Sequence, residues 1–255
     1  MRVSLIHMKT RGSVSEALSA ACKKISEAAE QKPNFIALPE YFSVPGFIEE
    51  FSSAEEIFQK TYNPTFEFLR KVSKQFPNIY IVGGTLVEKS QNTFFNTCLI
   101  WKNAKLLGSY RKRNPISIEV KIGISKGDKP FVFPTESGNI GSLICADIFN
   151  PEAVKQTVSL GAETIFLPVA SLSTHPNVKG HPLSEKIASE NGVFIVKVGN
   201  VRSDAKGGRS AIIAPWGIIE EAEETFSDKV ITADLDIQRL RRYREEINKG
   251  FSTPQ

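Results

Sequence analysis

The sequence predicts an α/β fold with a mixed β-sheet, and two observations carry this prediction. Short apolar runs rich in β-branched residues alternate with segments of helical pattern along most of the chain, as expected for strands alternating with helices. In the middle of the chain, three strand-like runs follow one another with only turns between them, at 79–87, 94–101 and 106–111. Consecutive strands without an intervening helix indicate antiparallel pairing inside the sheet.

The predicted elements follow in order along the chain. Strand-like runs lie at 3–6, 35–38, 79–82, 97–101, 140–144, 164–167 and 193–198. Helix-like segments lie at 13–30, 54–75, 151–160 and 181–191. A second strand-rich block has runs at 210–214, 218–220 and 230–235, and a basic helix at 237–248 follows it. Because no repeat and no long linker divides the chain, we expect one domain over residues 1–255.

The composition is that of an ordinary globular protein. The 255 residues are 41% hydrophobic and 24% charged, with a net charge of +4, close to the averages for folded domains. No apolar run approaches the roughly 20 residues that a membrane-spanning helix needs, and the first run is too short for a secretory signal. Cys22, Cys98 and Cys145 are odd in number and widely spaced, which fits reduced thiols. We therefore expect a cytoplasmic protein with no membrane partner.

Several functional classes lack their sequence signals. The chain has no phosphate-binding Gly-rich loop ending in Lys-Ser/Thr and no Gly-x-Gly-x-x-Gly. The basic clusters at 111–113 and 239–244 have no aromatic ladder on which bases would stack, so nucleic acid is not an expected partner. His175 and His181 lack a ligand spacing or a nearby cysteine, so we expect no metal site. A cysteine-histidine pair stays open as an alternative for catalysis.

Three reactive side chains stand just beyond apolar runs of the predicted sheet. They are Glu40, Lys112 and Cys145, after the runs at 35–38, 106–110 and 142–144. Because ligands bind outside the carboxyl ends of strands in open α/β sheets, a carboxylate, an ammonium and a thiol are expected to meet there. Taken singly, each has a plainer interpretation, as a surface acid, one charge of a basic run and a buried core thiol. Together they supply a base, a cation and a nucleophile.

These three groups suggest nucleophilic catalysis by the thiol. A free cysteine is only about 3% thiolate at pH 7 and needs activation. The Asn-Pro-Glu segment at 150–152 predicts a helix N-terminus close to Cys145, which would favour the thiolate. Glu40, if desolvated, would have a raised pKa, could accept the thiol proton and could return it to a departing amine. Lys112 and the backbone N–H of Ala146 would stabilise an oxyanion.

These residues and their order resemble the carbon-nitrogen hydrolase (nitrilase) superfamily, in an amidase-like branch. The Glu-Lys-Cys sites of that family match "LPEYF" around Glu40, "YRKRNP" around Lys112 and "ICADIFNPE" around Cys145. The stretches "IVGGT", "FNTCLIW", "SEKIASENGVFIVKVGNV" and "GRSAIIAPWG" extend the resemblance over nearly the whole chain. In "EVKIGISKG", Glu119 matches the second glutamate of the family, whose implied role is to orient the lysine.

The resemblance implies a fold and a reaction. The fold would be a four-layer αββα sandwich with two mixed β-sheets. The reaction would be hydrolysis of a non-peptide C–N bond in a small amide or carbamoyl compound, through a thioester on the cysteine, which water then cleaves. The resemblance further implies that no metal or cofactor takes part and that the chain forms a homodimer or a higher homo-oligomer.

The sequence departs from the family pattern beside the expected site. Ala146, Phe149 and Asn150 stand where amidase branches commonly have tyrosine, arginine and phenylalanine, and Asn114 stands where histidine is frequent. Nitrilases proper usually have Trp-Glu after the cysteine, so Ala146 followed by Asp147 favours amide over nitrile hydrolysis. A nitrile hydrolase and a non-catalytic ligand-binding protein of the same fold are the alternatives.

Five residues are candidates for the substrate pocket because they follow strand ends near the expected triad. They are Tyr41, Ala146, Phe149, Ala170 and Ser171, and His175 is a further candidate. Ordinary packing is the plainer interpretation of each. In the pocket, Phe149 would favour an apolar or aromatic substrate.

Overall fold

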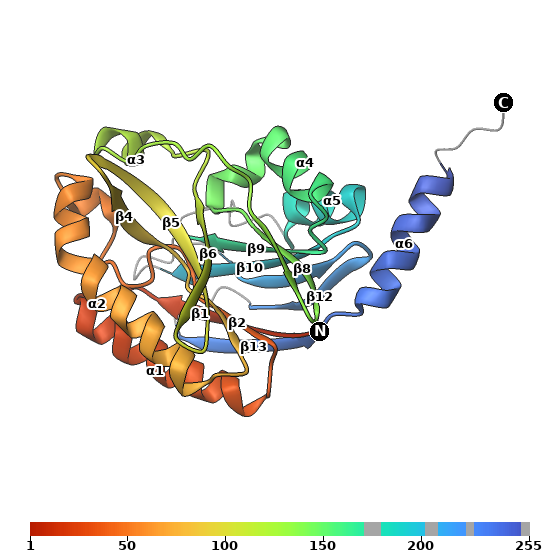
Figure 1. The fold of residues 1–255 in the computed structure, drawn as a ribbon, viewed down its shortest axis with the longest axis horizontal. Coiled ribbons are helices and arrows are strands. Elements are labelled where there is room, and N and C mark those ends of the chain that lie inside the picture. The colour runs from red at the N-terminus through yellow and green to blue at the C-terminus, as the bar shows by residue number, and fades with distance from the viewer. Residues whose placement is uncertain (171–179, 202–208, 223–226, 251–255) are drawn as a thin grey trace.

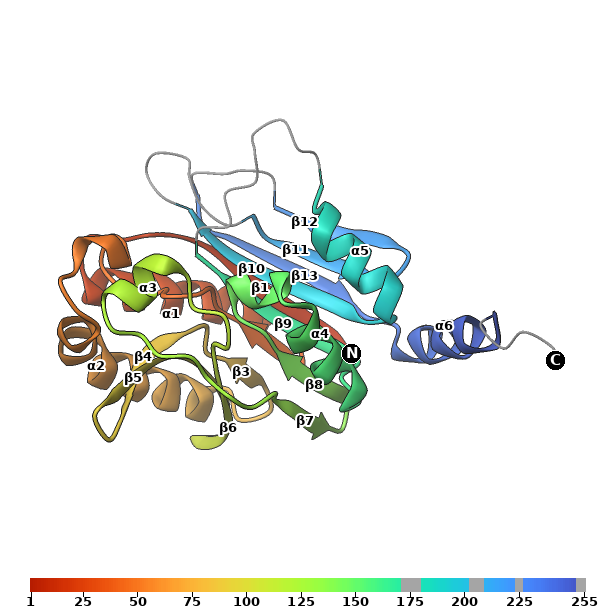
Figure 2. The same cartoon turned by 90° about the horizontal axis from the view of Figure 1, so that it is seen from above.

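Two β-sheets pack face to face, and helices cover the outer side of each sheet (Figure 1 and Figure 2). The structure, a computed structural model, describes residues 1–170, 180–201, 209–222 and 227–250. The strands are β1 (Arg2–Lys9), β2 (Phe35–Ala37), β3 (Tyr80–Val82), β4 (Leu86–Ser90), β5 (Thr93–Lys102), β6 (Lys105–Arg111), β7 (Val132–Thr135), β8 (Gly138–Ser142), β9 (Thr164–Val169), β10 (Phe194–Val201), β11 (Ala211–Ala214), β12 (Gly217–Glu221) and β13 (Lys229–Asp234). The helices are α1 (Val14–Glu30), α2 (Ala54–Gln75), α3 (Ser117–Lys121), α4 (Pro151–Ser159), α5 (Pro182–Asn191) and α6 (Ile237–Gly250). The fold is thus the four-layer αββα sandwich that the resemblance implies.

The first sheet is built around β1. Strands β1, β2 and β3 run parallel, with Phe35 of β2 opposite both Val3 and Tyr80. Strand β13 pairs antiparallel with β1 along residues 2–7. On the other side, β5 pairs antiparallel with β3, β4 and β6. The antiparallel pairing expected for the middle of the chain is therefore confirmed.

The second sheet has the same mixed character and joins the first. Strands β8, β9 and β10 run parallel, while β7, β11 and β12 add antiparallel strands at the two edges. Strand β1 also pairs with β10 at its end, where Met8 lies opposite Asn200 and Lys9 opposite Val201. The two sheets therefore meet near the carboxyl ends of their central strands, the place where α/β sheets bind ligands.

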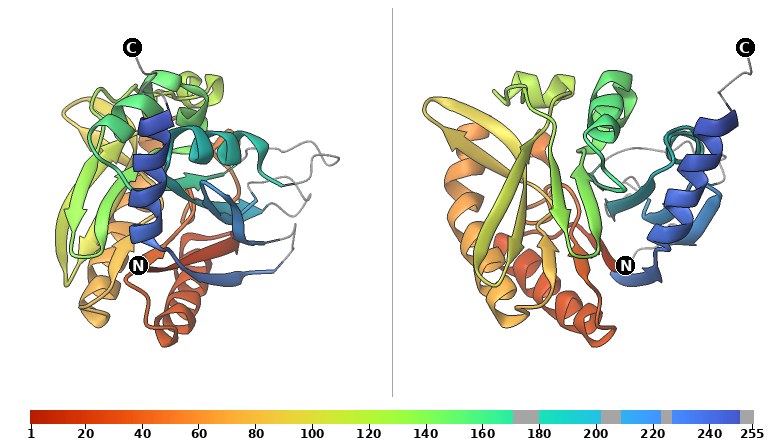
Figure 3. Two further views of the ribbon diagram at one scale, coloured as in Figure 1. Left: turned by 90° about the vertical axis from the view of Figure 1, so that its right-hand side faces the viewer. Right: turned by 45° about the vertical axis from the view of Figure 1, so that its right-hand side comes forward.

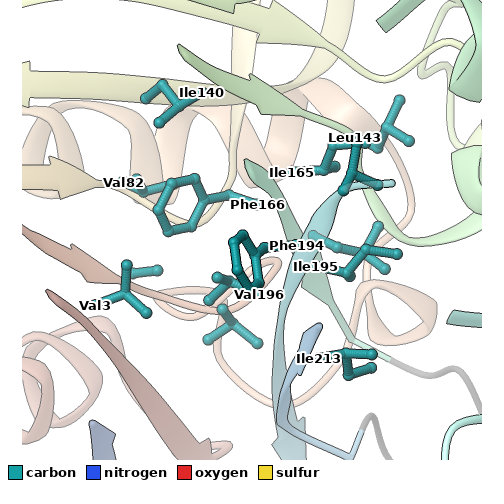
Figure 4. Packing of buried hydrophobic residues seen from close by; sticks show 14 of the residues in the cluster. Val3, Val82, Ile140, Leu143, Ile165, Phe166, Phe194, Ile195, Val196 and Ile213 are labelled. Atoms are coloured by element: carbon teal, nitrogen blue, oxygen red, sulfur yellow. The ribbon is translucent and has the colours of Figure 1, made fainter. Parts of the chain in front are cut away.

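The alternation of side chains along β1 divides the core into two clusters. Val3 and Leu5 pack between the sheets, whereas Ile6 and Met8 pack on the opposite face of the first sheet, beneath α1 and α2. This division follows from the period of two in a strand, because β1 is covered on both faces. Figure 4 shows Val3 and Phe166, from the two different sheets, in the cluster between them.

The five predicted helices begin and end within two residues of the predicted bounds. Helix α1 follows an N-cap at Ser13, whose hydroxyl accepts the Glu16 N–H at 3.3 Å, and it buries Ala17, Ala21 and Ile25 at helical spacing. In Figure 3, α6 runs along the rim of the second sheet and extends beyond it. Among the helices in the described part of the chain, none is long and apolar enough to cross a membrane.

Parts of the middle differ from the prediction. The strand expected at 79–87 is divided into β3 and β4, because Gly84 has a φ of 57° and approaches the carbonyl of Pro39 so closely that a Cβ would lie 2.2 Å from it. Helix α3 and strand β7 were not predicted, since 5 and 4 residues are too few to show a periodic pattern. The strand expected at 140–144 ends at Ser142.

Candidate active site

The fold brings Glu40, Lys112 and Cys145 together in one buried site. Glu40 follows β2 and Lys112 follows β6 in the first sheet, while Cys145 follows β8 in the second sheet. Their exposed fractions are 1%, 1% and 5%. The carboxyl ends of strands from both sheets therefore supply the three groups, as expected from their positions after apolar runs.

Two carboxylates hold the Lys112 ammonium. Its Nζ lies 2.9 Å from Glu40 Oε1 and 2.7 Å from Glu119 Oε2. Asn96 donates from Nδ2 to both carboxylates, at 2.8 Å to each Oε1. The orienting role implied for Glu119 agrees with this contact, because the ammonium is fixed between two charge-assisted hydrogen bonds.

The two carboxylates differ in how completely their oxygens are occupied. Glu119 Oε1 accepts the Tyr41 hydroxyl at 2.7 Å as well as Asn96, and its Oε2 accepts the Ile116 N–H at 2.8 Å as well as Lys112. Among the described residues, Glu40 Oε2 accepts the Ala170 N–H at 2.8 Å, and the Cys145 thiol is close enough to affect the pKa of Glu40. Glu119 is therefore saturated by fixed donors, whereas Glu40 retains an acceptor position beside the thiol.

The Cys145 thiol is protonated in the resting site. Burial raises its pKa and the charge of Glu40 raises it further, so that the opposing effect of Lys112 is outweighed. The predicted helix N-terminus is present at Pro151, and a 3₁₀-helix over residues 145–149 separates it from Cys145 along the chain. Attack by sulfur therefore requires a base at the moment of reaction.

Glu40 and Lys112 have the electrostatic properties of a base and a fixed cation. Burial raises the pKa of Glu40 above its usual range, and Glu119 adds to this, while Lys112 opposes it. Burial disfavours the charged form of Lys112, but its neighbours Glu40, Cys145 and Glu119 outweigh burial and raise the pKa of the ammonium. Lys112 therefore keeps its proton and Glu40 exchanges one more readily than an exposed carboxyl would near neutral pH.

Asp147 links the backbone next to Cys145 to the backbone next to Lys112 by hydrogen bonds. Its carboxylate is fully buried and accepts four hydrogen bonds. The donors are the Tyr110 hydroxyl at 2.7 Å and the backbone N–H groups of Ile144, Arg113 and Asn114 at 3.0, 3.0 and 2.6 Å. One carboxylate thus fixes the spacing between the chain that carries the ammonium and the chain that carries the thiol.

A cavity of about 20 Å³ opens at these groups. The catalytic candidates Glu40, Lys112, Glu119 and Cys145 line it, and so do the predicted pocket residues Tyr41 and Ala170. A volume of this size holds about one water molecule. The remaining lining residues are mostly apolar: Val44, Gly46, Phe47, Ile48, Ile116 and Asn200.

Two further predicted pocket residues, Ala146 and Phe149, are not among the residues that line this cavity. Ala146 is buried beside the site, and its carbonyl accepts Asn114 Nδ2 at 2.9 Å. The side chain of Phe149 is 58% exposed and is not among the residues that line the cavity. Ser171 and His175 lie outside the described residues.

The sequence reasoning missed three polar residues that build the site. Asn96 bridges the two carboxylates, Asn200 donates to the Glu40 carbonyl at 2.9 Å, and Asp147 joins the two segments. Asn96 and Asn200 are single amides inside strands, where nothing in a lone sequence separates them from ordinary strand residues. In the described part of the chain, no group of three or more His, Cys, Asp or Glu side chains could hold a metal ion.

A thiol, a carboxylate and an ammonium at the strand ends of an αββα sandwich define the class of cysteine-dependent hydrolases of this fold. The family model for carbon-nitrogen hydrolase matches residues 2–245. The chain belongs to this family, and it is therefore a hydrolase acting on carbon-nitrogen bonds other than peptide bonds.

Individual relatives match over nearly their full length. The omega-amidase NIT2 of Xenopus tropicalis is 32% identical over 259 residues, covering 96% of this chain and 92% of that protein. The omega-amidase NIT2-B of Xenopus laevis is 30% identical with the same coverage. The crystal structure of Saccharomyces cerevisiae Nit3, a member of branch 10 of the nitrilase superfamily, superimposes with a TM-score of 0.82 at 25% identity and covers 100% of this chain and 96% of that chain.

Proposed function

We propose that this protein is an amidase that hydrolyses the terminal carboxamide of a small molecule, with Cys145 as nucleophile. The observation that carries the proposal is the difference between the two carboxylates beside Lys112. Glu119 is saturated by four donors, whereas Glu40 also contacts the thiol and has a raised pKa. The similarity to omega-amidases supports a terminal amide as the substrate class.

Acylation begins with proton transfer from the Cys145 thiol to Glu40. The sulfur attacks the amide carbon, a C–S bond forms, and the carbonyl π electrons move to oxygen. Lys112 and the backbone N–H of Ala146 stabilise this oxyanion. Glu40 then gives its proton to nitrogen, the C–N bond breaks, and ammonia leaves a thioester on Cys145.

Deacylation repeats the proton transfers of acylation, with water as the nucleophile and Cys145 as the leaving group. Glu40 removes a proton from water, and the hydroxide attacks the thioester carbon. The C–S bond breaks, the thiolate recovers the proton from Glu40, and the carboxylic acid leaves. The sum is amide plus water giving acid plus ammonia. Glu119 takes no proton in this sequence and holds Lys112 in place, because its oxygens are fully occupied.

Intact-protein mass spectrometry tests the nucleophile. Wild type, Cys145→Ala and the matched control Cys98→Ala would be incubated with small amides, carbamoyl compounds and nitriles while ammonia is measured. Cys98 is a suitable control because it is buried and burial raises its pKa to about 12. We expect an acyl adduct and ammonia release with wild type and Cys98→Ala only.

Other outcomes would contradict the proposal. An adduct on Cys145→Ala would exclude this thiol as the nucleophile. Binding without acylation or ammonia release would indicate a ligand-binding protein, and acid release from nitriles but not from the matching amides would indicate a nitrile hydrolase.

A second pair of variants tests whether Glu40 carries the proton while Glu119 only positions Lys112. Removing a general base typically costs about 10²- to 10⁴-fold in rate, so Glu40→Gln should slow acylation by that order. Glu119→Gln should slow it less, since the base remains. Equal losses in the two variants would refute the assignment of Glu40 as the proton carrier.

We also propose that residues 1–255 form one hydrolase domain that assembles into a cytoplasmic homodimer or higher homo-oligomer. Both sheets contribute to the site, and Cys22, Cys98 and Cys145 are free thiols. Phe149 and Leu160, at the two ends of α4, are 58% and 56% exposed and offer apolar surface to a second copy. Light scattering after size-exclusion chromatography and cell fractionation test these points, and a monomer at micromolar concentration would contradict the assembly.

A further inference from the structure

The peptide that joins Glu40 to Tyr41 is followed by an unusual backbone conformation. Tyr41 has a φ of 53°, in the left-handed region that residues with a Cβ seldom adopt. In an extended chain, adjacent side chains point to opposite faces. Here both side chains reach one polar network, since Glu40 Oε1 lies 2.9 Å from Lys112 Nζ and the Tyr41 hydroxyl donates to Glu119 at 2.7 Å. The positive φ therefore lets two consecutive residues meet the charges around Lys112.

Two buried side chains hold this peptide, one from each sheet. The Glu40 carbonyl accepts a hydrogen bond from Asn200 Nδ2 at 2.9 Å, and the Tyr41 N–H donates to Thr85 Oγ1 at 3.0 Å. Asn200 lies on β10 of the second sheet, and Thr85 lies in the segment between β3 and β4 of the first sheet. Their exposed fractions are 3% and 0%. Both polar groups of one peptide are thus fixed by residues distant in the chain.

These two hydrogen bonds explain how the conformation persists. A residue in a sparsely populated backbone region stays there only where the surrounding structure over-determines it. Strand β2 ends at Ala37, so its hydrogen-bond ladder does not extend to this peptide. Without the Thr85 hydroxyl, the Tyr41 N–H would be a buried donor lacking its partner, and the peptide would gain by rotating toward another acceptor. Such a rotation would move Glu40 and Tyr41 together.

We infer that Thr85 and Asn200 are positioning residues for the general base. They keep the Glu40–Tyr41 peptide in the orientation in which the Glu40 carboxylate reaches Lys112. The inference rests on the proposed role of Glu40 as proton carrier and adds two residues that act on it through the backbone. Thr85 gives the sharper test, because it is not among the described residues that line the cavity, and its replacement leaves those residues unchanged.

Variants of similar shape test the inference. Thr85→Val removes the acceptor for the Tyr41 N–H, Thr85→Ser keeps it, and Asn200→Leu removes the donor to the Glu40 carbonyl. The control is Thr61→Val, because Thr61 is equally buried and its hydroxyl donates to the Ile57 carbonyl inside α2 at 2.8 Å. Steady-state kinetics on a small amide, together with denaturant unfolding of each variant, separate positioning from a loss of stability.

Thr85→Val should lower kcat by about 10- to 100-fold and change KM little, since displacing a catalytic group by about 1 Å can cost about 100-fold in rate. Thr85→Ser should restore most of this kcat. Thr61→Val should keep the wild-type kcat whatever its effect on stability. Wild-type kcat in Thr85→Val, or the same loss of kcat in Thr85→Ser as in Thr85→Val, would overturn the inference.

The double variant tests whether the two residues act on the same peptide. Thr85→Val combined with Asn200→Leu should lower kcat by less than the product of the two single losses, because either substitution alone frees the peptide. A loss equal to that product would show two independent effects and would overturn the shared role.

Crystal structures of wild type and Thr85→Val separate failure of this inference from failure of the proposed function, since they need no turnover. We expect the Glu40–Tyr41 peptide to rotate in the variant and the distance from Glu40 Oε1 to Lys112 Nζ to increase. An unchanged peptide would overturn the positioning role even if wild type is an active amidase. A rotated peptide, in a protein whose wild type hydrolyses no amide, would support the positioning role and refute the proposed function.

Discussion

Asp147 holds the geometry of the site without touching the reacting atoms. Its four hydrogen bonds fix the chain after Lys112 to the chain before Cys145. The backbone there is under strain, because Cys145 has a φ of 45°, a region costly for residues other than glycine. The buried carboxylate supplies the surrounding order that such a conformation needs.

Replacing Asp147 by asparagine should damage both stability and turnover. The amide would place an NH₂ group against backbone N–H donors, so that at least one of these would lose its partner, at about 1–3 kcal/mol. We expect kcat to fall more than KM changes, because the spacing of Lys112 and Cys145 loosens. Denaturant unfolding and steady-state kinetics measure the two effects. The matched control is Asp128→Asn, at an exposed position, and wild-type kcat in Asp147→Asn would refute the positioning role.

The raised pKa of Glu40 sets the acid limb of the pH profile. Glu40 must be deprotonated to take the thiol proton, so kcat/KM should be full above the pKa of Glu40 and fall as the pH drops through it. We expect a midpoint above the ordinary value of 4.5, since burial raises this pKa. Because the charge of Glu119 also raises it, Glu119→Gln should move the midpoint to lower pH.

The profile should be measured with a neutral amide, so that titration of the substrate does not interfere. Glu190→Gln, an exposed position on α5, is the control and should leave the midpoint unchanged. A wild-type midpoint at or below the ordinary carboxyl value would contradict the assignment of Glu40 as the base.

At the level of elements, the break between β3 and β4 supports the turn that carries Glu40. Gly84 has a φ of 57°, and a Cβ there would lie 2.2 Å from the carbonyl oxygen of Pro39. Gly84→Ala should therefore displace the Pro39–Glu40 backbone and lower both stability and kcat. Gly123→Ala is the matched control, since Gly123 has a φ of 99° but no atom within 4 Å of an added Cβ.

We expect Gly123→Ala to lower the free energy of unfolding by about 1 kcal/mol, the cost of a positive φ in a residue with a Cβ. Its kcat should stay unchanged. Gly84→Ala should lower the free energy of unfolding by more than this, because its Cβ also meets the Pro39 carbonyl. Equal unfolding midpoints and equal kcat in the two variants would show that the contact with Pro39 does not position Glu40.

The sequence predicted those helices and strands that are marked by residues close together in the chain, such as an N-cap or a continuous apolar run. Ser13 and Asn150 are N-caps of the expected helices, and their side chains accept the expected backbone N–H groups. The strands with central positions show continuous apolar runs because they are covered on both faces. The triad could be predicted because each member follows such a run and because their order resembles a known family.

The remaining parts of the site depend on contacts distant in sequence. Asn96 and Asn200 contact Glu40 from 56 and 160 residues away in the chain. The 3₁₀-helix between Cys145 and α4 was not predicted, because five residues are too few to show a periodic pattern.

At the scale of the whole molecule, the pairing of β1 with β10 and the shared core should make the two sheets unfold together. The two tryptophans report on different sheets. Trp101 lies on β5 of the first sheet and packs against Phe66 of α2, whereas Trp216 packs against Phe194 of β10 in the second sheet. With Trp101→Phe and Trp216→Phe, each protein keeps one fluorescent probe. Within each variant, we expect the fluorescence and circular dichroism transitions in urea to coincide. A separate transition for either probe would show that the sheets unfold independently.

The position of β1 also has a consequence for the time course of synthesis. Strand β1 lies between β2 and β13, and the bond from Arg2 to Asp234 joins residues 232 apart in the chain. At roughly 5–20 residues per second, a ribosome needs about 10 to 50 s to make that interval. During this time one edge of β1 has no neighbour, and open strand edges promote aggregation. The nascent chain therefore depends on its last strand to close the edge of its first.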